Sequence, residues 1–280
     1  MADVHQLRKK VHDVQKPYTK EGNIFYDKIL FKNFISSKGV RTPKTYLHIT
    51  NDNIQDIEKI HQYDEFVLKP NRGACGIDIY TLTKLNPDLY QEISGRQHAW
   101  HFIDGKTRQI NTIQFSGGVI IEEAIHNPKV FDQFLNGIPG ICDMRFYMLN
   151  DNILFGKLRV PTIASEGYAN TGRKAMAFFV DTKGIITEQG IFNNTSVNHP
   201  DLNRSFEGTK VPYWDQFTST AIQVAKLFKL AFHSVDLTID VTGEGTVIES
   251  EKIPLLNHFT SHGCDVMIKH LDEYLTQLSH

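Results

Sequence analysis

The segment "EFVLKPNRGACGIDIY", residues 65–80, joins two β-rich runs, 66–68 and 77–80, through a bend that contains glycine. Lys69 stands where the first run meets the bend, and Arg72 lies within the bend. Glycines let backbone N–H groups approach a ligand and cationic side chains neutralise its charge, so the segment indicates a phosphate site. An ordinary β-turn with a solvated lysine is the alternative. The Walker pattern G-x-x-x-x-G-K-[ST] is absent.

The composition is that of an ordinary globular protein. The 280 residues are 40% hydrophobic and 22% charged with a net charge of -2, which fits one large domain or two lobes and gives no support for nucleic-acid or anionic-membrane binding. The first fifteen residues lack the apolar run of a signal peptide, and no segment approaches the length of a transmembrane helix. Cys75, Cys142 and Cys264 are far apart, which is typical of free thiols. We therefore expect a cytoplasmic protein without membrane insertion.

The apolar periodicity predicts a mixed α+β chain. Helices are expected at 4–16, 26–38, 52–62 and 213–232, with Gly39 ending the second of them. Strands are expected in the run 117–125 and in hairpins at 143–162, 174–187 and 234–251. Residues 98–116 and 193–213 are expected to be irregular. Antiparallel hairpins dominate, so the regular βαβ order of a doubly wound sheet is not expected.

Three acids gather in the last predicted hairpin. Asp236 and Glu249 lie on its two strands, and Glu249 and Glu251 share a face because side chains alternate along a strand. Three carboxylates on one surface repel one another unless a cation lies among them, and Mg²⁺ prefers oxygen ligands. The alternative is a solvated acidic strand edge that discourages pairing with other chains.

Basic residues mark the two preceding hairpins. Arg145, Lys157 and Arg159 lie in the first, and Arg173 and Lys174 open the second. Cations that point inward from a sheet are costly unless an anion faces them. A solvated sheet face is the alternative for each residue taken singly.

The segment "VIIEEAIHNP", residues 119–128, combines an apolar strand, two acids and Ala124-Ile125. A segment of this kind suits a hinge that contacts adenine through its backbone and a ribose through an acid. Alone, the pattern is weak evidence for such a role.

The order of these motifs resembles that of the ATP-grasp superfamily over about residues 26–260. Residues 198–217, "NHPDLNRSFEGTKVPYWDQF", resemble a segment of its sugar-transfer-associated and α-L-glutamate ligase-related members. The resemblance implies an ATP-grasp fold, with two α+β lobes that hold a nucleotide between antiparallel sheets. The implied division is a helical segment at 1–25, an N-terminal lobe with the glycine-rich loop at 26–125, and a C-terminal lobe with the metal site at 126–280.

The resemblance also implies roles for particular residues. The nucleotide contacts are Lys28, Lys69, Arg72, Gly73, Gly76, Glu122, Glu123, Ala124, Ile125 and, for the ribose, Asp132. The Mg²⁺ ligands are Asp236, Glu249 and Glu251, and the catalytic cations are Arg145, Arg159 and Lys174.

The implied activity is an ADP-forming carboxylate–amine ligase that uses ATP and Mg²⁺. An acylphosphate forms first and an amine then attacks it, so that an amino acid is joined to a sugar acid or a peptide. Small-molecule or peptide acids and amines are the expected partners, and a homodimer or partner protein is compatible with the sequence. The alternatives are an ATP-dependent phosphotransferase and a non-catalytic nucleotide-binding partner of a glycan assembly system.

The sequence departs from the superfamily pattern at two places. Glu251 replaces the usual asparagine of the metal motif, with Asn257 as a candidate substitute. Fewer than 30 residues precede Lys28, where many of these ligases carry a further domain, so acceptor recognition is assigned to a partner protein or to residues 193–213.

Overall fold

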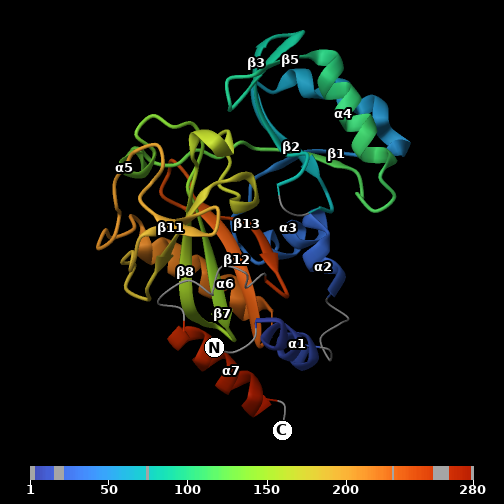
Figure 1. The fold of residues 1–280 in the computed structure, drawn as a ribbon. Helices are drawn as coiled ribbons and strands as arrows, with labels where there is room; N and C mark the ends of the chain where they lie inside the picture. Colours follow the sequence, from blue (N-terminus) through green and yellow to red (C-terminus); the bar gives the residue numbers. More distant parts are fainter. Residues whose placement is uncertain (1–3, 16–21, 74–75, 229, 255–264, 279–280) are drawn as a thin grey trace.

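Two antiparallel sheets, each with its own helices, form the two lobes of the protein (Figure 1). The computed structural model describes residues 4–15, 22–73, 76–228, 230–254 and 265–278. The predicted α+β class is confirmed.

The smaller lobe is a six-stranded sheet in the order β1-β6-β2-β3-β4-β5. Its strands are β1 (Thr45–Ile49), β2 (Glu65–Pro70), β3 (Tyr80–Asn86), β4 (Leu89–Glu92), β5 (Gln97–Ala99) and β6 (Val119–Glu122). The 3₁₀ helix η2 (Asn51–Gln62) and helix α4 (Trp100–Thr112) cover it, and Phe66, Leu68 and Ile121 lie in its core. This sheet places Lys69 and Glu122 on the central neighbouring strands β2 and β6.

Helix α4 occupies the segment that was expected to be irregular, so that prediction was wrong. Its buried face is formed by Ile103, Thr107, Ile110 and Asn111, which have helical spacing. Two of these four are polar, which hides the periodicity. Each of these two polar side chains donates a hydrogen bond to a backbone carbonyl of the preceding helical turn: the Thr107 hydroxyl to Ile103 O and the Asn111 amide to Thr107 O.

The larger lobe is a seven-stranded sheet in the order β11-β10-β9-β8-β7-β12-β13. Its strands are β7 (Asp143–Leu149), β8 (Asn152–Val160), β9 (Met176–Val180), β10 (Gly190–Phe192), β11 (Thr195–Val197), β12 (Phe232–Ile239) and β13 (Gly245–Glu251). Its shorter helices are η3 (Lys129–Phe131), α5 (Asp132–Leu135), η4 (Ile163–Ser165) and η5 (Thr171–Arg173), and its main helix is α6 (Trp214–Leu227). The predicted hairpins 143–162 and 234–251 are confirmed.

The two faces of the larger sheet differ in polarity. One face carries Met144 and Phe146 into the main core with α6. On the other face, helices α1 (Val4–Gln15) and α7 (Asp265–Leu278) cover Tyr147 and Phe155, at the bottom of Figure 1. The rest of that face carries buried charged residues, Asp143, Arg145, Lys157, Arg159 and Asp236. The charged half lies on the side of the smaller lobe.

The helix predicted at 26–38 is broken at Asp27. Helix α2 (Gly22–Tyr26) ends there, and α3 (Lys28–Ser36) starts with Asp27 as its N-cap, whose carboxylate accepts a hydrogen bond from Leu30 N. Gly39 has φ +76, and the following N–H donates to Ile35 O, as expected of a residue that ends a helix.

Helix α3 packs with the larger lobe, although it precedes the smaller sheet in sequence. Its Phe31 and Ile35 belong to the core of the larger sheet. The lobe boundaries predicted above stay a prediction.

Other element predictions need smaller corrections. The helix predicted at 213–232 ends at Leu227, and β12 begins at Phe232. Residues 193–213 include the short strand β11. The segment 77–79 precedes β3 rather than opening it. Within the described part of the chain, no helix has the length and apolarity needed to cross a membrane.

Candidate active site

A buried ion cluster links β2, β6 and α3. Lys69 Nζ lies 2.5 Å from Glu122 Oε1, and Lys32 Nζ lies 2.6 Å from Glu122 Oε2. All three side chains are nearly inaccessible to solvent. Burial alone would raise the pKa of Glu122, but the two ammonium groups hold it below its usual value. The cluster fixes the Lys69 side chain at the end of its strand.

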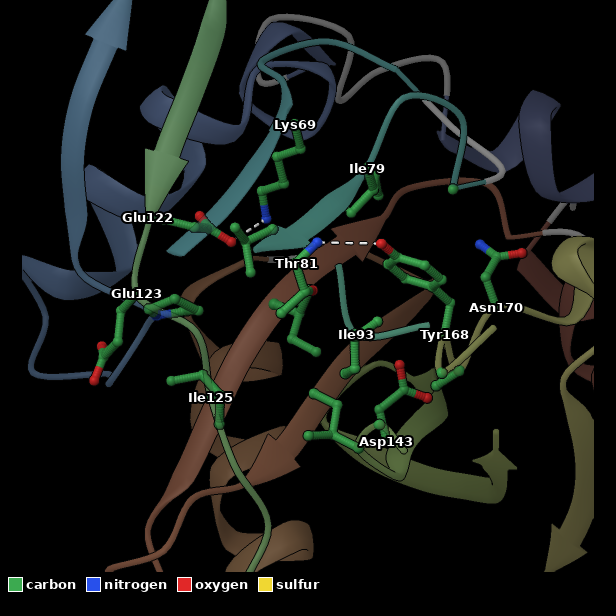
Figure 2. Close-up of a pocket in the computed structure, with 18 of the residues that line it drawn as sticks. Lys69, Ile79, Thr81, Ile93, Glu122, Glu123, Ile125, Asp143, Tyr168 and Asn170 are labelled. Carbon is green, nitrogen blue, oxygen red and sulfur yellow. Dashed lines mark hydrogen bonds and ion pairs between the residues drawn. The ribbon is translucent and has the colours of Figure 1, made fainter. Parts of the chain in front are cut away.

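Lys69 faces a cavity of about 350 Å³ between the two sheets (Figure 2). The smaller lobe contributes apolar atoms from Val67 and Thr81 of its sheet and from Ile93 in the turn after β4. The larger lobe contributes Ile141 and Ile248. A cavity with apolar walls and cations such as Lys28 and Lys69 in its lining suits a nucleotide, whose base is apolar on its faces and whose phosphates are anionic.

The predicted hinge lies on the wall of this cavity. Glu123 and Ile125 line it, whereas Ala124 does not. Glu123 is tied to the segment before β1, because its N–H donates to Lys44 O, its carboxylate accepts from Lys44 N, and Arg41 pairs with the same carboxylate at 3.1 Å. The backbone N–H of Glu123 is therefore already engaged, and a base contact through an N–H would fall on the following residues.

A loop of the larger lobe closes the opposite wall. The Tyr168 hydroxyl accepts a hydrogen bond from Thr81 N at 3.1 Å (Figure 2). It also donates to Glu92 Oε1 at 2.9 Å, so it bonds to two strands of the smaller sheet. The Arg173 guanidinium lies 3.7 Å from the centroid of the Tyr168 ring and donates to Ile79 O. These contacts hold the two lobes together across the cavity.

A second cavity of about 520 Å³ adjoins the first. Arg72 and Gly73 line this second cavity and not the nucleotide-sized one, whereas Gly76 lines the first. Its remaining wall includes aromatic rings from α2 and α3, namely Phe25, Tyr26 and Phe31, and residues 249–253. The two cavities share four lining residues: Lys28, Arg159, Asn170 and Glu249. These four mark the junction between the cavities.

Lys28 stands at this junction with a neutral partner. Its Nζ donates to Gly73 O at 3.1 Å, and burial lowers its pKa although Glu249 opposes the shift. An anion at the junction would offset the cost of this partly buried charge.

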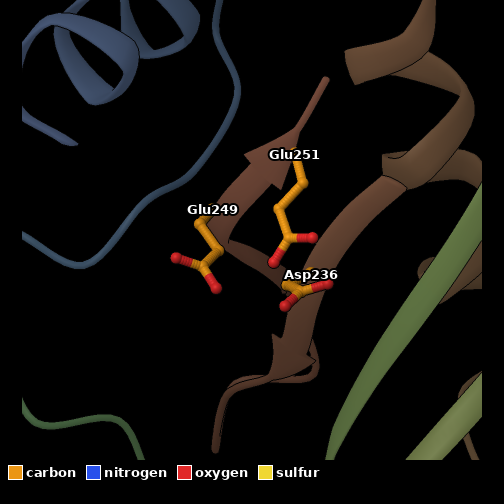
Figure 3. Close-up of side chains that lie close together, drawn as sticks. All are labelled: Asp236, Glu249 and Glu251. Atoms are coloured by element: carbon orange, nitrogen blue, oxygen red, sulfur yellow. The ribbon is translucent and has the colours of Figure 1, made fainter. Parts of the chain in front are cut away.

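The three predicted metal ligands come together on the paired strands β12 and β13. Asp236 lies opposite Glu249 in the register, and the carboxylate oxygens of Asp236, Glu249 and Glu251 lie within 4.8 Å of one another (Figure 3). Asp236 is fully buried, whereas the two glutamates are each about one-third exposed. We call these three residues the acid triad.

Arg145 and Arg159 lie against the acid triad. Arg145 Nε and Nη2 bond to the two oxygens of Asp236 at 2.7 and 2.6 Å. Arg159 Nε and Nη2 bond to the two oxygens of Asp143 at 2.5 and 2.6 Å, and Nη2 also bonds to Asp236. Burial would raise the pKa of Asp236, but the two guanidinium groups lower it to about 2.

The acid triad has the chemistry that Mg²⁺ requires. Three carboxylates from two adjacent strands supply hard oxygen donors, and two of them, Glu249 and Glu251, line the second cavity. Asn257, the candidate substitute ligand, lies outside the described residues.

The structure does not bring every predicted residue to the cavities. Asp132 is exposed at the start of α5 and lines neither cavity. Lys174 is exposed in a left-handed conformation with φ +71, and its neighbour Arg173 faces the nucleotide-sized cavity instead. Residues 193–213 line neither cavity, so they do not supply the expected acceptor site there.

Three residues at this site were not assigned a role from the sequence. Lys32 lies one helical turn after Lys28, so the sequence spacing already indicates that the two lysines share a face of the helix. Tyr168 and Asp143 gave none, because their roles depend on contacts with Glu92 and Arg159.

This fold and cavity define an ATP-grasp protein. The sequence matches the family described as sugar-transfer associated ATP-grasp over residues 12–270, so the chain belongs to that family. The predicted superfamily and fold are confirmed. A comparison with curated proteins gave no match.

Solved structures share the fold at low sequence identity. The D-alanine–D-alanine ligase of Bacillus anthracis complexed with ATP has a TM-score of 0.50 and 12% identity, over 91% of this chain and 66% of that one. The Helicobacter pylori D-alanine–D-alanine ligase gives 0.50 and 12%, over 91% and 61%. The biotin carboxylase domain of Hydrogenobacter thermophilus 2-oxoglutarate carboxylase, complexed with MgADP, gives 0.53 and 14%, over 91% and 46%. The chain thus spans less than two thirds of each of these proteins.

Proposed function

We propose that this protein is an ATP- and Mg²⁺-dependent carboxylate–amine ligase that forms ADP. The observation that carries the proposal is the meeting of two cavities at Lys28, Arg159 and Glu249, beside the acid triad. The first cavity has the polarity of an adenosine site and the second is open to another molecule. The Bacillus anthracis ligase, which shares the fold, forms a complex with ATP, and this supports ATP as the nucleotide.

In this arrangement, each cation has a separate task. Lys69 and Lys28 hold the phosphates, since Lys69 lies at the end of β2 in the wall of the first cavity and Lys28 lies at the junction of the cavities. Arg159 stabilises charge that develops on the transferred phosphoryl group. Mg²⁺ would be held by Asp236, Glu249 and Glu251, where it would neutralise negative charge on the phosphates of ATP.

The second cavity holds the acid substrate. Its carboxylate oxygen attacks the γ-phosphorus at the junction, the bond from that phosphorus to the β–γ bridging oxygen breaks, and ADP leaves. The amine nitrogen then attacks the acyl carbon and loses a proton, and inorganic phosphate leaves with the former carboxylate oxygen. Because the acylphosphate is sensitive to water, the closed wall around Tyr168 and Arg173 favours coupling over hydrolysis.

The substrate of the second cavity is an amino-acid, peptide or sugar acid. Arg72 there is held by Asp27, with Nη2 at 2.9 Å, and its side chain remains about half exposed. It therefore suits a contact with the acid substrate better than the nucleotide contact predicted from the sequence. Tyr26 is two-thirds exposed on the same wall and offers an aromatic face to the body of the substrate.

The test is a mass-spectrometric screen of sugar acids, amino acids and peptides with ATP, Mg²⁺ and a panel of amines. We expect ADP release that requires both an acid and an amine, with a product lighter than their sum by one water. Glu249→Gln, which keeps the side-chain volume, is expected to lose this activity. A stable phosphorylated product would instead identify a phosphotransferase, and nucleotide binding without turnover would identify a non-catalytic partner.

A further inference from the structure

Arg145 places one nitrogen among all three carboxylates of the acid triad. Its Nη2 lies 2.6 Å from Asp236 Oδ2, 2.8 Å from Glu251 Oε1 and 3.9 Å from Glu249 Oε1. A cation that these carboxylates share would lie in the same region. The guanidinium therefore serves as the counter-ion of the triad in this conformation.

Glu251 gives this arginine a second anchor. Arg145 Nη1 donates to Glu251 Oε2 at 3.2 Å while Nη2 donates to Oε1, so the carboxylate binds the guanidinium through both oxygens. An asparagine, which the superfamily pattern has here, offers one oxygen and no charge. The glutamate that distinguishes this sequence thus strengthens the hold on Arg145.

The charge balance leaves the triad attractive to a stronger cation. The three carboxylates face one guanidinium that contacts them all and a second, Arg159, that contacts only Asp236. The acid triad therefore still carries an excess of negative charge and attracts a cation. The Arg145 guanidinium, however, lies where a divalent ion would bind, and its positive charge repels that ion.

We propose that Arg145 is a built-in competitor of the metal, and that a divalent cation binds tightly only when the Arg145 guanidinium leaves the acid triad. The alternative anion for Arg145 is a phosphate that reaches the second cavity, whose wall Arg145 shares. Metal uptake and nucleotide binding are then coupled, because the nucleotide provides the acceptor that releases the triad. This coupling rests on the proposed nucleotide function, whereas the competition itself does not.

The experiment measures Mn²⁺ binding to the nucleotide-free protein by electron paramagnetic resonance. Arg145→Gln is expected to bind Mn²⁺ at least tenfold more tightly than the wild type. Arg159→Gln is the matched control, because it removes the same charge from the neighbouring strand but leaves Arg145 among the carboxylates. Its gain is expected to be several-fold smaller, and Arg145→Gln combined with Glu249→Gln is expected to lose the gain.

Equal Mn²⁺ affinity of Arg145→Gln and Arg159→Gln would overturn the proposal, as would tight Mn²⁺ binding by the nucleotide-free wild type. Circular dichroism checks that each variant is folded. If Arg145→Gln does not fold, Arg145→Lys serves, since an ammonium keeps the charge but cannot bridge two carboxylates through a fork, and an intermediate gain is expected. Failure of the wild type to bind nucleotide with Mn²⁺ present would count against the proposed function and not against the competition.

Discussion

Replacing Lys69 or Lys32 by methionine is expected to separate nucleotide binding from stability. Both ammonium groups are buried, and each bonds to one oxygen of Glu122 at almost the same distance, 2.5 and 2.6 Å. Of these two lysines, only Lys69 lines the nucleotide-sized cavity. The two substitutions are therefore a matched pair that differs in exposure to the proposed ligand and in one further bond of Lys32, to Thr45 Oγ1 at 3.2 Å.

The expected magnitudes follow from the bonds that each variant loses. A hydrogen bond to a charged group contributes about 1.5–3 kcal/mol, so both variants should lower the free energy of unfolding by about that amount. Lys69→Met also removes one charged contact with phosphate, which corresponds to a roughly ten- to hundredfold increase in the Kd for ATP. Lys32→Met should leave the Kd within about threefold of the wild type.

Isothermal titration calorimetry with the non-hydrolysable analogue AMPPNP and Mg²⁺ measures the affinities, and urea unfolding measures the stabilities. An equal loss of affinity in both variants would mean that Lys69 acts through stability alone. An unchanged affinity in Lys69→Met would remove the lysine from the nucleotide site.

Three further predictions use other parts of the structure. Arg173→Ala should weaken AMPPNP binding and Lys174→Ala should not, because only the arginine faces the cavity; titration of both variants checks this, and the reverse order would restore the role assigned to Lys174. Tyr168→Phe leaves the buried Glu92 short of one bond, so thermal unfolding should show a loss of about 1–3 kcal/mol, and an unaltered melting curve would contradict the closing contact. Burial lowers the pKa of His233 to about 4 from the usual 6.5. As the pH falls, the unfolded state therefore binds the proton before the folded state does, and the folded state loses stability. Urea unfolding should show a loss of about 3 kcal/mol between pH 7.5 and 4 in the wild type that is absent in His233→Phe.

The acid triad could be predicted because its three residues lie within one hairpin and are close in sequence. Asp236 and Glu249 lie on strands joined by a short turn, and the period of two places Glu249 and Glu251 on one face. The pairing of Arg145 with Asp236 could not be predicted in the same way. It depends on β7 and β12 lying side by side, although the two residues are 91 positions apart.

Local conformation explains two of the errors. Lys174 is a non-glycine residue in the left-handed region, which the sequence does not reveal, and its side chain is exposed while Arg173 takes the place in the cavity wall. Asp27 caps α3 and breaks the helix predicted through it. The long-range packing of α3 on the larger lobe then decides which aromatic residues line the second cavity.

The central claim is that a nucleotide is held between the two sheets, in contact with both. Hydrogen–deuterium exchange with and without AMPPNP and Mg²⁺ tests it most directly. With the nucleotide bound, slower exchange is expected in β2, in β6 and the hinge that follows it, and in β13. The protection in both lobes should appear at the same nucleotide concentration. Protection confined to one lobe, or none in either, would contradict the account.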